Sequence, residues 1–176
     1  MNKKIIVING VAGSGKNTFV SYLKTLMPDL IEHSTIDTVK KMAWQYLGVD
    51  HCQDKTDEKR QLWHDLKKAW IKYNDGPLKE ILSLQYWNYD RLLVVHCREP
   101  KEIRKIKNHF GDRCLTVLIT RPGIDVPGND ADQGVLNCEY DHWIVNDGGF
   151  DDLEKSARFV WGELGKKETN PGHIFG

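Results

Sequence analysis

The sequence contains one stretch whose residue types and spacing suit the binding of a phosphate chain. Residues 10–18 read Gly-Val-Ala-Gly-Ser-Gly-Lys-Asn-Thr and match the pattern G-x-x-x-x-G-K-[ST], except that Asn17 stands at the Ser/Thr position. Glycines let backbone N–H groups turn inward around a phosphate, and the N-terminus of a following helix adds roughly half a positive charge. Lys16 would supply a mobile cation for the β- and γ-phosphates. We therefore predict that a nucleotide is bound by Gly10, Val11, Ala12, Gly13, Ser14, Gly15, Lys16, Asn17 and Thr18.

Asn17 changes what this loop can offer a metal ion. A Ser or Thr hydroxyl at this position normally binds Mg²⁺, and an asparagine carbonyl oxygen is also a hard neutral ligand but reaches one atom further. Thr18, the next residue, is expected to face the α-phosphate. We predict Asn17 and Thr18 as the ligands that the protein offers to Mg²⁺, directly or through a water. The alternative interpretation of the whole stretch is a glycine turn between a strand and a helix, without a ligand.

The rest of the chain predicts the elements that would position this loop. Apolar runs alternate with segments of helical period, which is typical of a parallel sheet covered by helices. Because strands joined by helices cross over right-handedly, we expect an α/β protein, a three-layer α/β/α sandwich with a five-stranded parallel sheet and a P-loop, nucleotide-kinase-like fold. In such a sheet, ligands bind beyond the carboxyl ends of the strands. The strands are predicted at residues 5–8, 30–34, 92–97, 115–120 and 142–146, and the helices at about residues 19–27, 36–47, 56–74, 78–87, 100–110 and 151–164.

Length and composition limit the class of protein. The chain has 176 residues, enough for one compact core, so we expect residues 1–176 to form a single domain. Lysine plus arginine number 25 and aspartate plus glutamate number 25, and a nucleic-acid or anionic-membrane surface, which needs a basic excess, is not expected. The longest aliphatic runs, residues 5–8 and 92–95, are too short to span a bilayer. The start of the sequence resembles no signal peptide, and four cysteines without a C-x-x-C pair favour a cytoplasmic protein with reduced thiols.

Two segments lack the pattern of a helix or a strand. Residues 122–134 are rich in proline, glycine, aspartate and asparagine, a composition typical of a mobile surface loop. We predict a lid-like loop at about residues 122–138, which contains no lysine or arginine. The last segment, about residues 166–176, is predicted to be a flexible tail.

Five short motifs, taken in order, resemble those of the phage-type deoxynucleoside monophosphate kinases and the animal-type phosphomevalonate kinases. The resemblance extends over roughly residues 4–165, and only the P-loop motif is specific by itself. Where those families commonly have the Asp of S-G-K-D-T, this chain has Asn17, and where they have the Asp of D-T-R, it has His96. The matching residues are Ser14-Gly15-Lys16-Asn17-Thr18 in the loop, Val39-Lys40 in the second helix, Arg98 after the third strand, Thr120-Arg121-Pro122-Gly123 after the fourth and Val145-Asn146-Asp147-Gly148 after the fifth.

The resemblance implies a kinase that uses ATP and Mg²⁺ to phosphorylate a nucleoside monophosphate, with a deoxynucleotide as the first expectation. Its partners would be these small molecules, and neither nucleic acid nor membrane. Phosphoryl transfer needs positioning and cations around the moving γ-phosphoryl group, and we predict Lys16, Arg98 and Arg121 as those catalytic cations. Asn146 and Gly148 would shape the adenine site. The predicted acceptor-binding residues are Ser34, Asp37, Lys40 and Arg98.

Other interpretations stay open for these residues. Arg98 could be a surface arginine paired with Glu99 or Glu102. Lys40 could belong to a solvated helix face, and an Asp-Gly turn after the fifth strand needs no ligand. We expect His96 to be a buried, hydrogen-bonded histidine, and Glu99 could replace the carboxylate that is missing there. For the chain as a whole, the alternatives are a kinase for another small substrate, such as phosphomevalonate or dephospho-coenzyme A, and a non-catalytic nucleotide-binding module.

Overall fold

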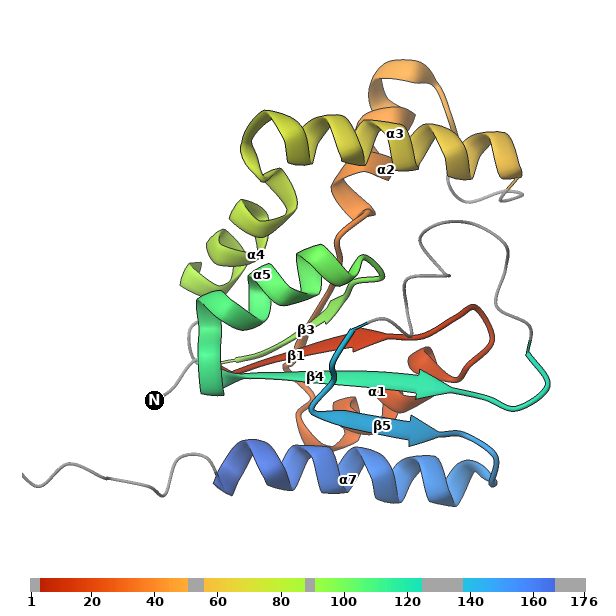
Figure 1. Cartoon of the computed structure of the whole chain (residues 1–176), viewed down its shortest axis with the longest axis vertical. Helices are drawn as coiled ribbons and strands as arrows, with labels where there is room; N and C mark the ends of the chain where they lie inside the picture. Colours follow the sequence, from red (N-terminus) through yellow and green to blue (C-terminus); the bar gives the residue numbers. More distant parts are fainter. Residues whose placement is uncertain (1–3, 51–55, 88–90, 125–137, 167–176) are drawn as a thin grey trace, which may run out of the picture.

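A sheet of five parallel strands, in the order β2-β3-β1-β4-β5, forms the centre of the molecule (Figure 1). The structure is a computed structural model that describes residues 4–50, 56–87, 91–124 and 138–166. Most of the predicted lid and nearly all of the predicted tail lie outside the described residues. The strands are β1 (Lys4–Asn9), β2 (Ile31–Ser34), β3 (Leu92–His96), β4 (Cys114–Thr120) and β5 (His142–Val145). The predicted sheet is therefore confirmed.

The three central strands are apolar on both sides because helices cover both faces of the sheet. The strand β1 pairs with β3, where Ile8 lies opposite His96, and with β4, where Asn9 lies opposite Leu118. All pairings are parallel. The carboxyl ends of the five strands therefore meet at one edge, and the loop that follows β1 begins between the ends of β3 and β4.

The helices confirm the predicted layers. Helices α1 and α7 cover one face, and α4 and α5 cover the other (Figure 1). Alternate residues of β1 supply the two cores: Ile6 packs with Phe19 and Leu153, whereas Ile5 packs in the cluster on the opposite face. Full burial of each such side chain contributes about 1.5–3 kcal/mol. The helices are α1 (Lys16–Leu26), α2 (Asp37–Leu47), α3 (Asp57–Asn74), α4 (Gly76–Trp87), α5 (Pro100–Phe110) and α7 (Phe150–Lys166), with a 3₁₀ turn η1 (Gly111–Arg113).

Helices α2 and α3 lie apart from the two sheet cores and form a small apolar cluster of their own. Its buried members are Val39 and Ala43 of α2 and Trp63 of α3. Thr56 caps the start of α3, since its hydroxyl accepts a hydrogen bond from the backbone N–H of Lys59 at 3.4 Å. Within the described ranges, no helix has the length and apolar character that crossing a membrane requires.

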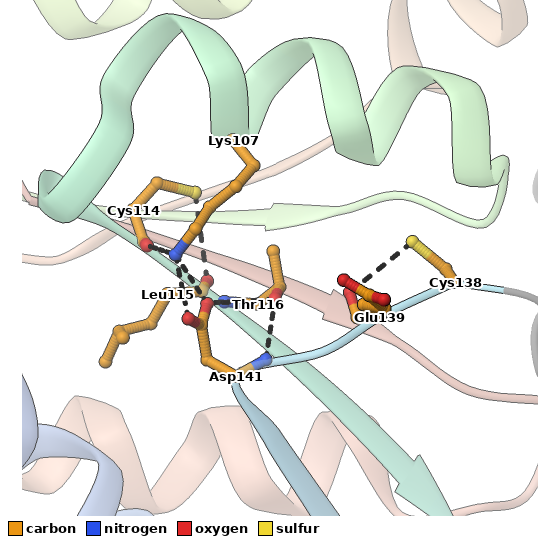
Figure 2. Close-up of polar contacts among 7 residues, drawn as sticks. All are labelled: Lys107, Cys114, Leu115, Thr116, Cys138, Glu139 and Asp141. Carbon is orange, nitrogen blue, oxygen red and sulfur yellow. Dashed lines mark hydrogen bonds and ion pairs between the residues drawn. The ribbon is translucent and has the colours of Figure 1, made fainter.

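A polar network fixes the place where β5 joins the sheet (Figure 2). The carboxylate of Asp141, just before β5, accepts hydrogen bonds from the backbone N–H and the hydroxyl of Thr116 at 2.8 and 2.9 Å. The ammonium of Lys107 on α5 donates to the same carboxylate at 2.7 Å and to the carbonyl of Cys114 at 2.6 Å. Burial alone would raise the pKa of Asp141, but the bonds from Lys107 and Thr116 outweigh it and hold that pKa below its usual value. The network fixes the register of β5 against β4. Asn146, which follows β5, therefore lies at the carboxyl edge of the sheet.

Candidate active site at the carboxyl edge of the sheet

The loop between β1 and α1 has the backbone that its glycines predict. Gly10, Gly13 and Gly15 have φ angles of +146°, +80° and +103°, which residues with a Cβ rarely adopt. A Cβ on Gly10 would lie 2.3 Å from the carbonyl oxygen of Ile119, and one on Gly15 would lie 2.5 Å from the Nδ2 atom of Asn146. The loop is therefore packed closely against the ends of β4 and β5, and larger residues cannot take these two places without displacing their neighbours.

Lys16 lies across this loop. Its ammonium donates hydrogen bonds to the carbonyl oxygens of Gly10 and Val11 at 2.5 and 2.6 Å. An ammonium held by loop carbonyls can turn toward a phosphate oxygen, as the predicted role of Lys16 requires. Asn17 and Thr18 follow in the first turn of α1, where Asn17 is exposed and Thr18 half-buried. Their neutral oxygen donors fit a Mg²⁺ ion that keeps most of its coordination to phosphate oxygens and water.

Hydrogen bonds from Asn146 hold the loop between β1 and α1 at the end of β5. Its backbone N–H donates to the carbonyl of Thr120 at 2.7 Å, and its side-chain Nδ2 donates to the carbonyl of Ser14 at 2.9 Å. The predicted contacts of Asn146 and Gly148 with adenine stay predictions. The sequence did not predict the bond from Asn146 to the loop backbone, which makes Asn146 a positioning residue for the loop between β1 and α1.

We expect Asn146→Ala to weaken the binding of a non-hydrolysable ATP analogue with Mg²⁺ by about 3- to 10-fold. The reason is that one hydrogen bond contributes about 0.5–1.5 kcal/mol, and about 1.4 kcal/mol is a factor of ten in affinity. Isothermal titration calorimetry measures the change. The matched control is Asn108→Ala on the exposed side of α5, which should bind as the unmodified protein does. Equal affinity in the two variants would show that the bond to Ser14 does not support the loop.

Asn9 is a site residue that the sequence analysis missed. Its side chain is only 1% exposed, and its Oδ1 accepts a hydrogen bond from the backbone N–H of Gly10 at 2.7 Å. Its Nδ2 donates to the carbonyl of Arg98 at 3.2 Å and to the hydroxyl of Tyr140 at 2.7 Å. Burial raises the pKa of Tyr140 to about 12, so this hydroxyl stays neutral. The available signal was a polar residue that ends an apolar strand directly before the loop.

The two predicted arginines lie at the same edge, on either side of the loop. Arg98 follows β3 and Arg121 follows β4, the two strands that flank β1, and both residues are exposed. The backbone of Arg98 is held by Asn9, so a rigid strand end carries its guanidinium. The strand order therefore brings Lys16, Arg98 and Arg121 to one end of the sheet.

Three of the four residues predicted for the acceptor, Ser34, Asp37 and Lys40, lie at the end of β2 and in the first turn of α2, and Arg98 follows β3. Asp37 accepts a hydrogen bond from the backbone N–H of Ser34 at 2.9 Å, which orders the turn into α2. The ammonium of Lys40 lies 5.4 Å from the centre of the Trp63 ring on α3, within the range of a cation–π contact. These contacts give Asp37 and Lys40 local partners, and their roles in acceptor binding stay predictions.

His96 takes part in a chain of polar contacts away from the loop. Its Nε2 lies 2.9 Å from the carboxylate of Glu32, which also accepts a bond from Lys24 of α1 at 2.6 Å. Burial alone would raise the pKa of Glu32, but the bonds from Lys24 and His96 outweigh it and lower that pKa. His96 is thus hydrogen-bonded, as the sequence indicated, but its side chain is 17% exposed and not buried as expected, because β3 ends at His96 and its side chain points to Glu32 near the edge of the sheet.

Comparison with known proteins identifies the fold. No family model and no curated protein matches the sequence. Among solved structures, a shikimate kinase from Aquifex aeolicus is similar with a TM-score of 0.54 and 12% identity, over 94% of this chain and 98% of that one. A gluconokinase from Sinorhizobium meliloti is similar with a TM-score of 0.53 and 15% identity, over 97% of this chain and 98% of that one. A dephospho-CoA kinase from Campylobacter jejuni is similar with a TM-score of 0.51 and 14% identity, over 92% of this chain and 97% of that one. These neighbours are small-molecule P-loop kinases, and this chain has their fold.

Proposed function

We propose that this protein transfers the γ-phosphoryl group of ATP to a small-molecule acceptor. The observation that carries the proposal is the loop of residues 10–18, in which three glycines in the left-handed region, a buried Ser14 and the Lys16 ammonium form a phosphate cradle. The fold of its structural neighbours, which are small-molecule kinases, supports it. The site lies where ligands bind in open α/β sheets.

The roles of the residues follow from their chemistry. The backbone amides of the loop and the N-terminus of α1 would hold the phosphate oxygens, and Lys16 would neutralise charge on the β- and γ-phosphates. Arg98 and Arg121 would stabilise the transferring group from either side. A bound Mg²⁺ ion, held from the protein by Asn17 and Thr18, would neutralise further phosphate charge.

The first acceptor class to test is the nucleoside monophosphates, because the order of the sequence motifs resembles kinases that act on them. The second class is small molecules with a hydroxyl acceptor, which the carboxylate of Glu99 beside Arg98 favours. Purified protein is incubated with ATP, Mg²⁺ and each acceptor, and ADP is measured. We expect ADP formation that depends on the acceptor. Tight nucleotide binding with no transfer to any acceptor would instead indicate a nucleotide-binding module without kinase activity.

We expect Arg98→Ala to lower turnover by about 10²-fold, the effect of removing one preorganised donor to a transition state. Nucleotide affinity should change less than about twofold, because the loop and Lys16 carry nucleotide binding. Steady-state rates at saturating substrates and calorimetric affinities separate the two effects. Arg104→Ala, on the exposed side of α5, is the control and should leave both unchanged. An unaltered turnover in Arg98→Ala would remove Arg98 from the site.

A further inference from the structure

A buried ion pair joins helix α3 to the ends of β2 and β3. The side chain of Lys67 is 3% exposed, and its ammonium lies 2.5 Å from the Oε2 atom of Glu99. The same ammonium donates a hydrogen bond to the hydroxyl of Thr35 at 2.7 Å. Thr35 in turn donates its backbone N–H to the carbonyl of His96 at 3.1 Å. Lys67 therefore holds three segments together at the edge of the sheet that carries the phosphate loop.

The carboxylate of Glu99 does not cap helix α5, although Glu99 stands at the N-cap position of that helix. Glu99 stands directly before α5, where a side-chain oxygen commonly accepts a bond from the first turn of the helix. Glu99 makes no such bond, and its carboxylate reaches α3 instead. Its side chain is 25% exposed, and besides the bond from Lys67 the carboxylate accepts a hydrogen bond from the backbone N–H of Glu99 itself. Lys67 thus fixes the Oε2 oxygen in place, while part of the side chain stays accessible from solvent.

The position of Glu99 relative to the phosphate loop is set by Arg98. The carbonyl of Arg98 accepts the bond from Asn9, whose own Oδ1 holds the first amide of the loop at Gly10. Glu99 is the next residue along the chain, and its carboxylate turns toward α3, on the side of β3 away from β4. The carboxylate of Glu99 therefore faces α3 at the carboxyl edge of the sheet, after the strand that lies next to β1.

We propose that Glu99 is the catalytic carboxylate for an acceptor hydroxyl and that Lys67 is its positioning residue. The inference rests on the proposed phosphoryl transfer and specifies its acceptor as a hydroxyl compound. The hydroxyl oxygen attacks the γ-phosphorus of ATP, and the bond from that phosphorus to the β,γ-bridging oxygen breaks with its electron pair leaving on ADP. The hydroxyl proton passes to Glu99 and then to solvent. A phosphate acceptor has no such proton to lose and would meet the negative charge of Glu99.

The charges around Glu99 suit this role. Burial alone would raise its pKa, but the charge and hydrogen bond of Lys67 outweigh burial and keep that pKa below its ordinary value. His64 on α3 acts in the same direction. The neighbouring thiol of Cys97 has a pKa raised to about 12 by burial and stays neutral. Glu99 is therefore ionised at neutral pH, able to orient a hydroxyl and to take its proton once the bond to phosphorus has formed.

The test compares two substitutions with two controls. Glu99→Gln keeps the shape and a hydrogen-bond acceptor for Lys67 but loses the base, and Lys67→Met keeps the length of the buried side chain but loses its charge. The controls are Asp112→Asn, an exposed carboxylate in η1 at the opposite edge of the sheet, and Lys68→Met, the exposed neighbour of Lys67 on α3. Acceptors are offered in two sets: deoxynucleoside monophosphates, and hydroxyl compounds comprising shikimate, gluconate, deoxynucleosides and dephospho-coenzyme A.

We expect turnover with at least one hydroxyl compound, and a loss of kcat of about 10²-fold in Glu99→Gln with nucleotide affinity unchanged within about twofold. In Lys67→Met the acid limb of the pH profile of kcat should move to higher pH, because the pKa of Glu99 rises when the ammonium is removed. A merely structural role of the pair would lower stability without moving that limb. Both controls should match the unmodified protein.

The other outcomes separate the inference from the proposed function. If only monophosphates are phosphorylated, or if Glu99→Gln keeps more than half of its kcat, the inference is wrong and the proposed phosphoryl transfer stands. If no acceptor of either set is phosphorylated, the proposed function fails and the inference falls with it. Should Glu99→Gln fail to fold, the double variant Lys67→Met/Glu99→Gln leaves no unpaired buried charge. It should be as slow as predicted for Glu99→Gln, and normal turnover in it would overturn the inference.

Discussion

Lys16→Ala should reduce ADP formation by about 10³-fold at saturating ATP and acceptor. In the structure the Lys16 ammonium donates to two carbonyls of the loop, so it already lies against the loop that we propose as the phosphate-binding site. Without it, the negative charge that develops on the leaving β-phosphate loses its nearest cation. Steady-state ADP release measures the loss. Stability should fall by about 1–3 kcal/mol, because Lys16 makes two hydrogen bonds to the loop and each contributes about 0.5–1.5 kcal/mol.

The control for this prediction is Lys155→Ala on α7. The side chain of Lys155 is 76% exposed and forms an ion pair with Asp152 of its own helix, so its removal should leave turnover and melting temperature unchanged. If Lys16→Ala keeps more than a tenth of the original turnover, the phosphate chain does not bind against this loop.

Gly10→Ala should abolish nucleotide binding and destabilise the fold by about 2–5 kcal/mol. The first cause is steric, because the added Cβ would lie 2.3 Å from the backbone oxygen of Ile119 and 2.7 Å from the hydroxyl of Ser14. The second is backbone strain, because a φ of +146° is unfavourable for any residue with a Cβ. Because the contact is with backbone, the loop itself must shift. Urea unfolding measures the loss of stability. The rise in melting temperature on adding ATP and Mg²⁺, which should disappear, measures nucleotide binding.

Gly162→Ala is the matched control. Gly162 lies inside α7, where a Cβ would meet nothing within 4 Å, and alanine favours a helix over glycine by about 1 kcal/mol. This variant should therefore be equally or more stable and should bind nucleotide normally. A Gly10→Ala variant that is still stabilised by ATP and Mg²⁺ as the unmodified protein is would contradict the assignment of the loop.

The fold could be predicted because its signals are local. The apolar runs of β1 and β3 are continuous and that of β4 is interrupted only by Thr116, as expected of strands buried on both faces. The loop could be predicted for the same reason, since its glycines mark backbone angles that the structure contains at Gly10, Gly13 and Gly15.

The site contacts could not be predicted because they join distant residues. Lys67 occurs in a charged helix beside Lys68, and nothing nearby indicates that one of the two is buried; its partners Thr35 and Glu99 are each 32 residues away. The bond from Asn146 to Ser14 spans 132 residues. Such pairings depend on how the helices and strands dock, which residue patterns within one element do not encode.

The separate apolar cluster of α2 and α3 affects how the protein unfolds. It buries few side chains, Val39, Ala43 and Trp63, whereas each face of the sheet buries a much larger set. Segments with few buried apolar contacts open locally at a lower free energy than the whole domain. Loss of the ion pair between Lys67 and Glu99 would therefore let α2 and α3 detach from the sheet while the sheet remains folded. A spectroscopic melting curve dominated by the sheet would not detect that local opening.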